Sequence, residues 1–244
     1  MADGLGVVAV RVEDERAVVV RVVVGAHPGT SVVACTGGHR GGVEGIHRRT
    51  VLGFERRRSR DDRLPPGQYL ERGFPVLSAG PTPETALDEW TFRIAGAVEE
   101  ERTWTWEEFQ ALESETPTVD IHCVTTWSKF DTTWEGVSVD TLLEGVEPLG
   151  GYVTAFSDGG YTTNLPLEDL TGGRAWVVYG FDGEDLEPEH GGPARLLVPH
   201  LYFWKSAKWV RGLRLTPEDE PGFWETLGYH DRGDPWLEQR YQGD

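Results

Sequence analysis

The chain has 244 residues, enough for one large domain or for a domain with an extension, and its net charge is -18. This charge excludes nucleic acids and anionic membrane surfaces as general partners, because a polyanion is repelled over most of the protein surface. No run of about 18 apolar residues occurs, so we predict no membrane span and expect a cytoplasmic protein. The two cysteines, Cys35 and Cys123, are too few for a disulfide framework.

Charge and composition both change near Arg63. Residues 1–63 carry 11 Lys and Arg against 8 Asp and Glu, whereas residues 64–244 carry 12 against 33. The sequence before this point is rich in valine, glycine and arginine, and the sequence after it is rich in tryptophan and acidic residues. We therefore predict an N-terminal extension over 1–63 and one domain over 64–244.

The extension has two interpretations. Residues 7–24 are compatible with a hairpin of two β-branched runs, but the glycine-rich stretch 37–49 has no hydrophobic period and favours a disordered extension or an over-long start. Cys35, His39 and His47 imitate a metal cluster, but their spacing fits no common metal site.

The acidic domain contains the signals of a strand-rich fold. Trp90, Phe92 and Ile94 alternate with polar residues as in a half-buried strand, and Thr105 with Glu108 forms a capping box that opens a short helix. Further strands are predicted at 119–124, at 152–156 and 161–165 as a hairpin about 158–160, and at 175–181, 195–198 and 209–215. Strands and helices do not alternate regularly, which favours an α+β class with a mixed sheet.

Cys123 stands at the end of one predicted strand, in the sequence Ile-His-Cys-Val-Thr-Thr-Trp-Ser. A lone buried cysteine is most often structural. The functional alternative is a thiolate ligand for a redox metal, since a bound metal deprotonates the thiol.

A cationic segment follows far along the chain. Between residues 195 and 214 there are five cations and no acid, namely Arg195, Lys205, Lys208, Arg211 and Arg214, preceded by a His-Gly-Gly-Pro turn at 190–193. Glycines let backbone N–H groups approach an anion, and arginine grips a phosphate with two hydrogen bonds. The segment therefore indicates a phosphate-bearing cofactor or an anionic substrate. The alternative is that these cations pair with surface acids.

The order of these motifs resembles the sulfite-oxidase-like family. The motifs are Cys123 with Trp127-Ser128, Trp134-Glu135-Gly136-Val137, Gly192-Pro193-x-Arg195 with Pro199, and Lys205-Ser206-x-Lys208, within residues 64–244. The chain looks most similar to the short branch that has the molybdopterin domain alone, related to the catalytic subunit of protein-methionine-sulfoxide reductase. The resemblance implies a sulfite-oxidase-type molybdopterin-binding domain.

The resemblance also implies a cofactor and roles for residues. By this resemblance, molybdopterin binds molybdenum and Cys123 is the protein ligand to the metal. The implied reaction is oxygen-atom transfer to or from a small sulfur- or nitrogen-containing substrate. Arg195, Ser206 and Lys208 match positions that hold the pterin and its phosphate, and Lys205 and His190 match less closely. The turn beginning at Ser157 is similar to family sequence that lines the metal pocket, which nominates Ser157, Asp158 and Tyr161.

Two departures limit this expectation. Residues 74–78 lack the sequence motif with which relatives contact the cofactor. In addition, no arginine stands close to Cys123 in the sequence, and this absence argues against sulfite as the substrate. A haem motif, a dinucleotide fingerprint and an iron–sulfur cysteine cluster are all missing from the sequence, so electrons are expected to pass through a separate partner. The alternatives are a carrier that holds molybdopterin without turnover, and a carboxylate-based hydrolase.

Overall fold

The computed structural model describes residues 62–244, and these residues form two β-sheets with a few short helices. The hairpin, metal-cluster and disorder predictions for residues 1–61 lie outside the described residues. The extension boundary stays a prediction as well.

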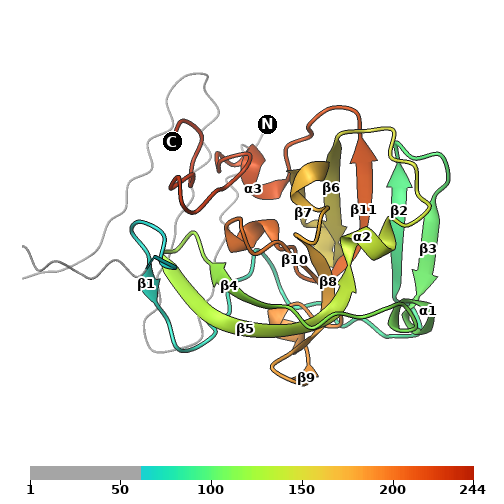
Figure 1. Ribbon diagram of the computed structural model, residues 1–244, viewed down its shortest axis with the longest axis horizontal. Helices are drawn as coiled ribbons and strands as arrows, with labels where there is room; N and C mark the ends of the chain where they lie inside the picture. The colour runs from blue at the N-terminus through green and yellow to red at the C-terminus, as the bar shows by residue number, and fades with distance from the viewer. Residues whose placement is uncertain (1–61) are drawn as a thin grey trace, which may run out of the picture.

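The five-stranded sheet has the order β3-β2-β11-β6-β7. Its upright strands stand side by side in Figure 1. Only the pair of β2 and β11 is parallel, and the other three pairs are antiparallel. The bounds are β2 (Thr91–Gly96), β3 (Arg102–Thr105), β6 (Tyr152–Ser157), β7 (Thr162–Pro166) and β11 (Val210–Thr216).

The six-stranded sheet is built around β5 and β8. Its main path is β1-β5-β8-β10, with β4 paired to β5 and β9 paired to β8. Figure 1 shows β5 as a long curved strand. Its pair with β1 is parallel, and the other pairs are antiparallel. The bounds are β1 (Tyr69–Leu70), β4 (Thr118–His122), β5 (Trp127–Ser138), β8 (Trp176–Phe181), β9 (Glu184–Asp185) and β10 (Arg195–Leu197).

The helices are short. The α-helices are α1 (Trp106–Gln110), α2 (Val139–Leu142) and α3 (Phe223–Thr226), and the 3₁₀ turns are η1 (Asp158–Gly160), η2 (Leu167–Asp169), η3 (Pro188–His190) and η4 (Phe203–Lys205). The predicted capping box opens α1: Glu108 N–H donates to Thr105 Oγ1 at 3.3 Å, and Thr105 N–H donates to Glu108 Oε2 at 2.9 Å. Within residues 62–244 no helix is long and apolar enough to cross a membrane, and a cytoplasmic location stays a prediction.

Two apolar clusters fill the interior. The larger one takes side chains from both sheets, among them Phe92 and Leu213 of the first and Val137 and Leu196 of the second. The smaller one lies on the six-stranded sheet and contains Ile121, Cys123, Trp127, Trp134, Trp176, Val178, Leu186 and Leu197. The predicted metal ligand is therefore part of a packed aromatic environment.

The strand-rich α+β class is confirmed, including the 152–165 hairpin. β5 is the main element that the sequence did not predict. It has 12 residues, and its burial alternates only over 131–136. Its first two residues are both buried, and so are its last three after a β-bulge between Glu135 and Gly136, so no single two-residue period runs through the strand.

Candidate active site

Cys123 follows the last residue of β4, where the chain turns into β5. Cys123 N–H donates to Trp127 O at 2.8 Å and Thr126 N–H donates to Cys123 O at 3.0 Å, so the thiol is carried on a tight turn between two paired strands. Thr126 takes a φ of 77° to close this turn. Gln68 Nε2 donates to Cys123 O at 3.1 Å. The backbone of the cysteine is thus fixed from both sides.

The Cys123 side chain is buried, and its sulfur lies 3.1 Å from Thr125 Oγ1. Burial raises the pKa of the Cys123 thiol, while the Thr125 hydroxyl and the charge of Lys208 oppose this increase. Lys208 is 85 residues away in the sequence, yet its charge lies within electrostatic range of the thiol. The cationic segment reaches the same apolar cluster through Phe203, which packs on the cluster that contains Cys123 and lies against Arg195. A bound metal would supply the stronger effect that produces the thiolate.

The turn η3 and the glycine after it are hydrogen-bonded to residues 208 and 209 of the cationic segment. Trp209 N–H donates to Gly191 O at 3.1 Å, and its indole Nε1 donates to Pro188 O at 2.7 Å. Lys208 Nζ donates to Glu189 O at 2.5 Å. Gly191 has a φ of 114°, and a Cβ there would lie 3.1 Å from Lys208 Cα. Glycine is required at this position because both the conformation and the close approach exclude a side chain.

Arg195 is buried behind this turn. Its Nη1 donates to His190 O at 2.6 Å and its Nη2 to Ser206 O at 2.7 Å, while the guanidinium lies 4.0 Å from the ring centroid of Phe203. The Nε of Arg195 is buried without a partner among the described residues. Burial lowers the pKa of Arg195 to about 9.

Arg195 and Lys208 form a pair of neighbouring cations. Burial, and then the charge of Arg195, lower the pKa of Lys208 to about 7. No carboxylate among residues 62–244 forms an ion pair with either side chain. Like charges held together away from water cost free energy unless an anion compensates them. The site is therefore suited to a buried anionic group.

His190 and Ser206 complete this group of residues. The His190 ring stacks on Phe74 with centroids 3.9 Å apart, and burial, Lys208 and Arg195 lower its pKa to about 4, so the imidazole is neutral near pH 7. The Ser206 hydroxyl accepts Val198 N–H at 2.9 Å. The stretch 74–78 lacks the sequence motif of the family, but it still lines this group of residues through the Phe74 ring.

The residues predicted in the turn that begins at Ser157 differ in their surroundings. Ser157 Oγ is buried and has no hydrogen-bond partner among residues 62–244, and Tyr161 OH donates to Trp204 O at 2.6 Å. Burial, followed by the charge of Glu225, raises the pKa of Tyr161 well above its usual value, and Arg195 opposes this. Tyr161 is therefore within electrostatic range of the buried Arg195.

Two predicted residues make their contacts elsewhere. Lys205 Nζ lies 2.6 Å from Glu225 Oε1 and is fully buried with it. Asp158 accepts a hydrogen bond from Thr85 Oγ1 at 2.9 Å, and its carboxylate lies 3.5 Å from Arg211 Nη1. Both side chains already have partners, so neither joins the group around Cys123, Arg195 and Lys208. Their predicted roles stay predictions.

Tyr229 was missed by the sequence interpretation. It follows α3, and its pKa is raised to about 12 by burial, by Tyr241 and by the charge of Cys123. The phenol therefore lies within electrostatic range of the thiol. No motif signalled it, because Tyr229 is 106 residues from Cys123 and stands in a stretch without periodicity. Gln68 was missed for the same reason.

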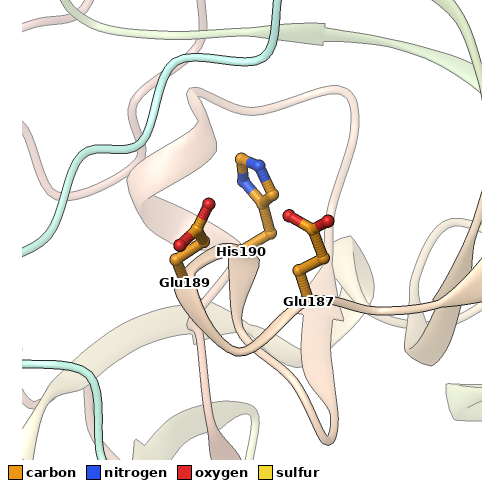
Figure 2. A group of neighbouring side chains, drawn as sticks. All are labelled: Glu187, Glu189 and His190. Carbon is orange, nitrogen blue, oxygen red and sulfur yellow. The ribbon is translucent and has the colours of Figure 1, made fainter. Parts of the chain in front are cut away.

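The turn at η3 also carries a group of metal-binding residue types. The ligand atoms of Glu187, Glu189 and His190 all lie within 4.8 Å of one another. Figure 2 shows the three side chains on this turn. Both carboxylates are exposed, and besides them the cations Lys208 and Arg195 act on His190. We assign no metal to this turn, because exposed acidic side chains often lie together without one and the two cations oppose the binding of a third.

Comparison with known proteins places this site in a family. Residues 79–224 match the oxidoreductase molybdopterin binding domain, and this range includes Cys123, Arg195 and Lys208. The chain belongs to this family. Molybdopterin with molybdenum is the cofactor of this molybdopterin oxidoreductase, and the buried Arg195 and half-buried Lys208 near a buried thiol fit an anionic cofactor.

Several relatives support the assignment. The molybdopterin oxidoreductase is 43% identical over 196 residues to the uncharacterized oxidoreductase YuiH of Bacillus subtilis, covering 79% of this chain and 99% of YuiH. It is 26% identical to the putative protein-methionine-sulfoxide reductase subunit YedZ1 of Azospira oryzae, covering 68% of this chain and 64% of YedZ1. It is also 26% identical to the protein-methionine-sulfoxide reductase catalytic subunit MsrP of Pseudomonas syringae, covering 67% of this chain and 53% of MsrP.

A solved structure shows the same fold. The sulfane dehydrogenase SoxCD of Paracoccus pantotrophus superposes with a TM-score of 0.54 at 22% identity, covering 59% of this chain and 42% of the SoxCD chain. The predicted sulfite-oxidase-type fold of the molybdopterin oxidoreductase is thereby confirmed.

Proposed function

We propose that this protein catalyses oxygen-atom transfer to or from a small sulfur- or nitrogen-containing substrate, with Cys123 as the protein ligand to molybdenum. The observation that carries the proposal is the convergence of a buried thiol with the buried Arg195 and the half-buried Lys208, neither of which forms an ion pair with a carboxylate among residues 62–244. The bound cofactor supplies two-electron chemistry and the dithiolene sulfurs, and the protein supplies binding, orientation and the electric field.

The cations have a binding role in this proposal. Arg195 and Lys208 would hold the phosphate of molybdopterin, since an anion there compensates two neighbouring charges. Ser206 and the neutral His190 would contribute polar contacts to the pterin. The buried Ser157 hydroxyl has no protein partner, which makes it a further contact for a bound group.

The phenols of Tyr229 and Tyr161 would act as hydrogen-bond donors. Tyr229 is held protonated by burial near Cys123, and Tyr161 is held protonated beside Arg195. A protonated phenol at the metal side can donate a hydrogen bond to a substrate oxygen and keep it oriented. We assign this task to Tyr229, because Tyr161 already donates to Trp204 O.

Sulfur oxides are the first substrates to test. Two relatives carry protein-methionine-sulfoxide reductase in their names, and this chain spans 64% and 53% of their lengths. Electrons would come from a separate redox partner. We also propose that residues 64–244 form the catalytic domain and that residues 1–63 are an extension.

Metal analysis tests the assignment directly. Full-length protein produced in cells that make molybdopterin should contain close to stoichiometric molybdenum and pterin. With reduced viologen as electron donor and methionine sulfoxide as oxygen-atom donor and electron acceptor, viologen oxidation should depend on the protein. Protein without molybdenum would contradict the proposal.

The direction of transfer requires a second assay. Sulfite with ferricyanide as electron acceptor probes the oxidative reaction, and we expect it to be slower than sulfoxide reduction. Faster sulfite oxidation would overturn the preference for sulfoxides. An absorption band that bleaches with dithionite and does not return with an oxo donor would argue for a carrier without turnover.

A further inference from the structure

Glu225 is a fully buried carboxylate that the proposed reaction does not use. Its Oε1 lies 2.6 Å from Lys205 Nζ and accepts hydrogen bonds from Trp204 Nε1 at 2.9 Å and Thr163 Oγ1 at 3.0 Å. A buried ion pair is weak evidence for stability, because apolar residues of similar volume often serve as well. The partners that Glu225 holds in place are therefore more informative than the ion pair itself.

Trp204 connects this carboxylate to both phenols of the site. Its carbonyl accepts the hydrogen bond of Tyr161 OH at 2.6 Å. Its indole ring meets the Tyr229 ring edge to face, with centroids 5.2 Å apart and an interplanar angle of 82°. An indole held by its N–H has a fixed orientation, so the ring that packs on it is fixed as well.

The backbone around α3 fixes the other side of Tyr229. Tyr229 N–H donates to Trp224 O at 3.1 Å, and Gly228 N–H donates to Glu225 O at 3.1 Å. The main chain of residues 224 and 225 thus holds the segment that carries Tyr229, and the Glu225 side chain holds the indole on which Tyr229 packs. Both restraints meet on the Tyr229 ring, which packs on the Trp204 indole, and the phenol lies within electrostatic range of Cys123.

We propose that Glu225 is a positioning residue that, through the indole of Trp204, sets where the Tyr229 phenol lies relative to Cys123. The inference rests on the proposed function in one respect, namely that Cys123 is the metal ligand. Glu225 itself touches neither cofactor nor substrate.

Two matched double variants separate this role from the ion pair. Glu225→Gln/Lys205→Met removes both buried charges and keeps an acceptor for Trp204 Nε1. Glu225→Leu/Lys205→Met removes the same charges together with the acceptor. Any difference between them reports the hydrogen bond to the indole, because the loss of charge is common to both.

The readout is the phenol of residue 229 itself. The cofactor-loaded full-length enzyme would carry 3-fluorotyrosine at position 229, and its ¹⁹F resonance would be titrated with pH. The Gln variant should keep the wild-type midpoint. In the Leu variant the phenol should become more solvated, and the midpoint should fall by about one pH unit.

Trp204→Phe is the independent check, since it keeps a ring and removes the N–H donor. It should lower the titration midpoint as the Leu variant does. If the Leu variant does not fold, Trp204→Phe alone tests whether the indole N–H positions Tyr229. Equal midpoints in the Gln and Leu variants, or a wild-type midpoint in Trp204→Phe, would overturn the proposal. Wild-type protein that holds no molybdenum would instead contradict the proposed function, whatever the variants do.

Discussion

At the scale of single residues, the site consists of a soft thiol and two cations in a region from which water is largely excluded. Cys123, Arg195 and Lys208 each have a pKa displaced by burial in the direction of the uncharged form. A group of this kind is incomplete without a compensating anion and a metal.

The first residue prediction concerns the metal ligand. Cys123→Ser should leave the fold intact and much of the pterin bound but abolish turnover, because an alcohol is a poor ligand for a soft metal. Sulfoxide reduction should fall at least about 100-fold, a loss in the range of 3 kcal/mol or more in transition-state free energy. Activity close to wild type would refute the role of Cys123.

The second residue prediction concerns Lys208 in the protein without cofactor. Its pKa is lowered in the folded state to about 7, so between pH 7 and its ordinary value the unfolded chain binds the proton and the folded chain does not. The contribution of Lys208 to the free energy of unfolding therefore rises with pH in this window, and its destabilising effect is greatest at and below pH 7.

Lys208→Met should remove this dependence. We expect the cofactor-free variant to be more stable than wild type by roughly 1–3 kcal/mol at pH 7, with the difference shrinking toward pH 9. Urea unfolding at several pH values measures it. The same variant should retain less molybdopterin, and a variant with unchanged stability and full cofactor content would show that Lys208 is not an unpaired cation of the site.

At the scale of elements, turns rather than regular helices hold the functional side chains. The β4–β5 turn holds Cys123, η3 holds His190, and the segment after α3 holds Tyr229. These turns are attached to paired strands, which gives loop residues a rigid frame.

An element far from the site offers a control. Thr105→Ala removes the capping box of α1 and should cost about 1 kcal/mol of stability. Molybdenum content and turnover should stay at wild-type values, because α1 contributes no site residue. Loss of cofactor in this variant would mean that general destabilisation, and not a specific contact, empties the site.

At the scale of the whole molecule, two sheets share one core and the site lies on the smaller apolar cluster. The conserved geometry of the fold is visible in the likeness to SoxCD. Near the start of the described residues, Arg63 Nη2 lies 2.6 Å from both Asp120 Oδ1 and Asp131 Oδ1, which ties this end of the domain to β4 and β5.

The whole-molecule prediction concerns the extension. Removing residues 1–50 should change molybdenum content and turnover by less than about twofold, because the proposed catalytic domain starts at residue 64. Circular dichroism and metal analysis of the truncated protein measure this. A truncated protein that fails to fold would show that the extension is structural.

The sequence by itself determined the class of the fold, the capping box at Thr105, the 152–165 hairpin and the family. These features depend on local spacing or on motifs that remain recognisable without coordinates. Only the tertiary structure decided that Lys208 and Tyr229 lie within electrostatic range of Cys123, and that Lys205 is paired with Glu225 instead of facing the site. Contacts between residues so distant in the chain are fixed by strand pairing and packing, for which local sequence carries no signal.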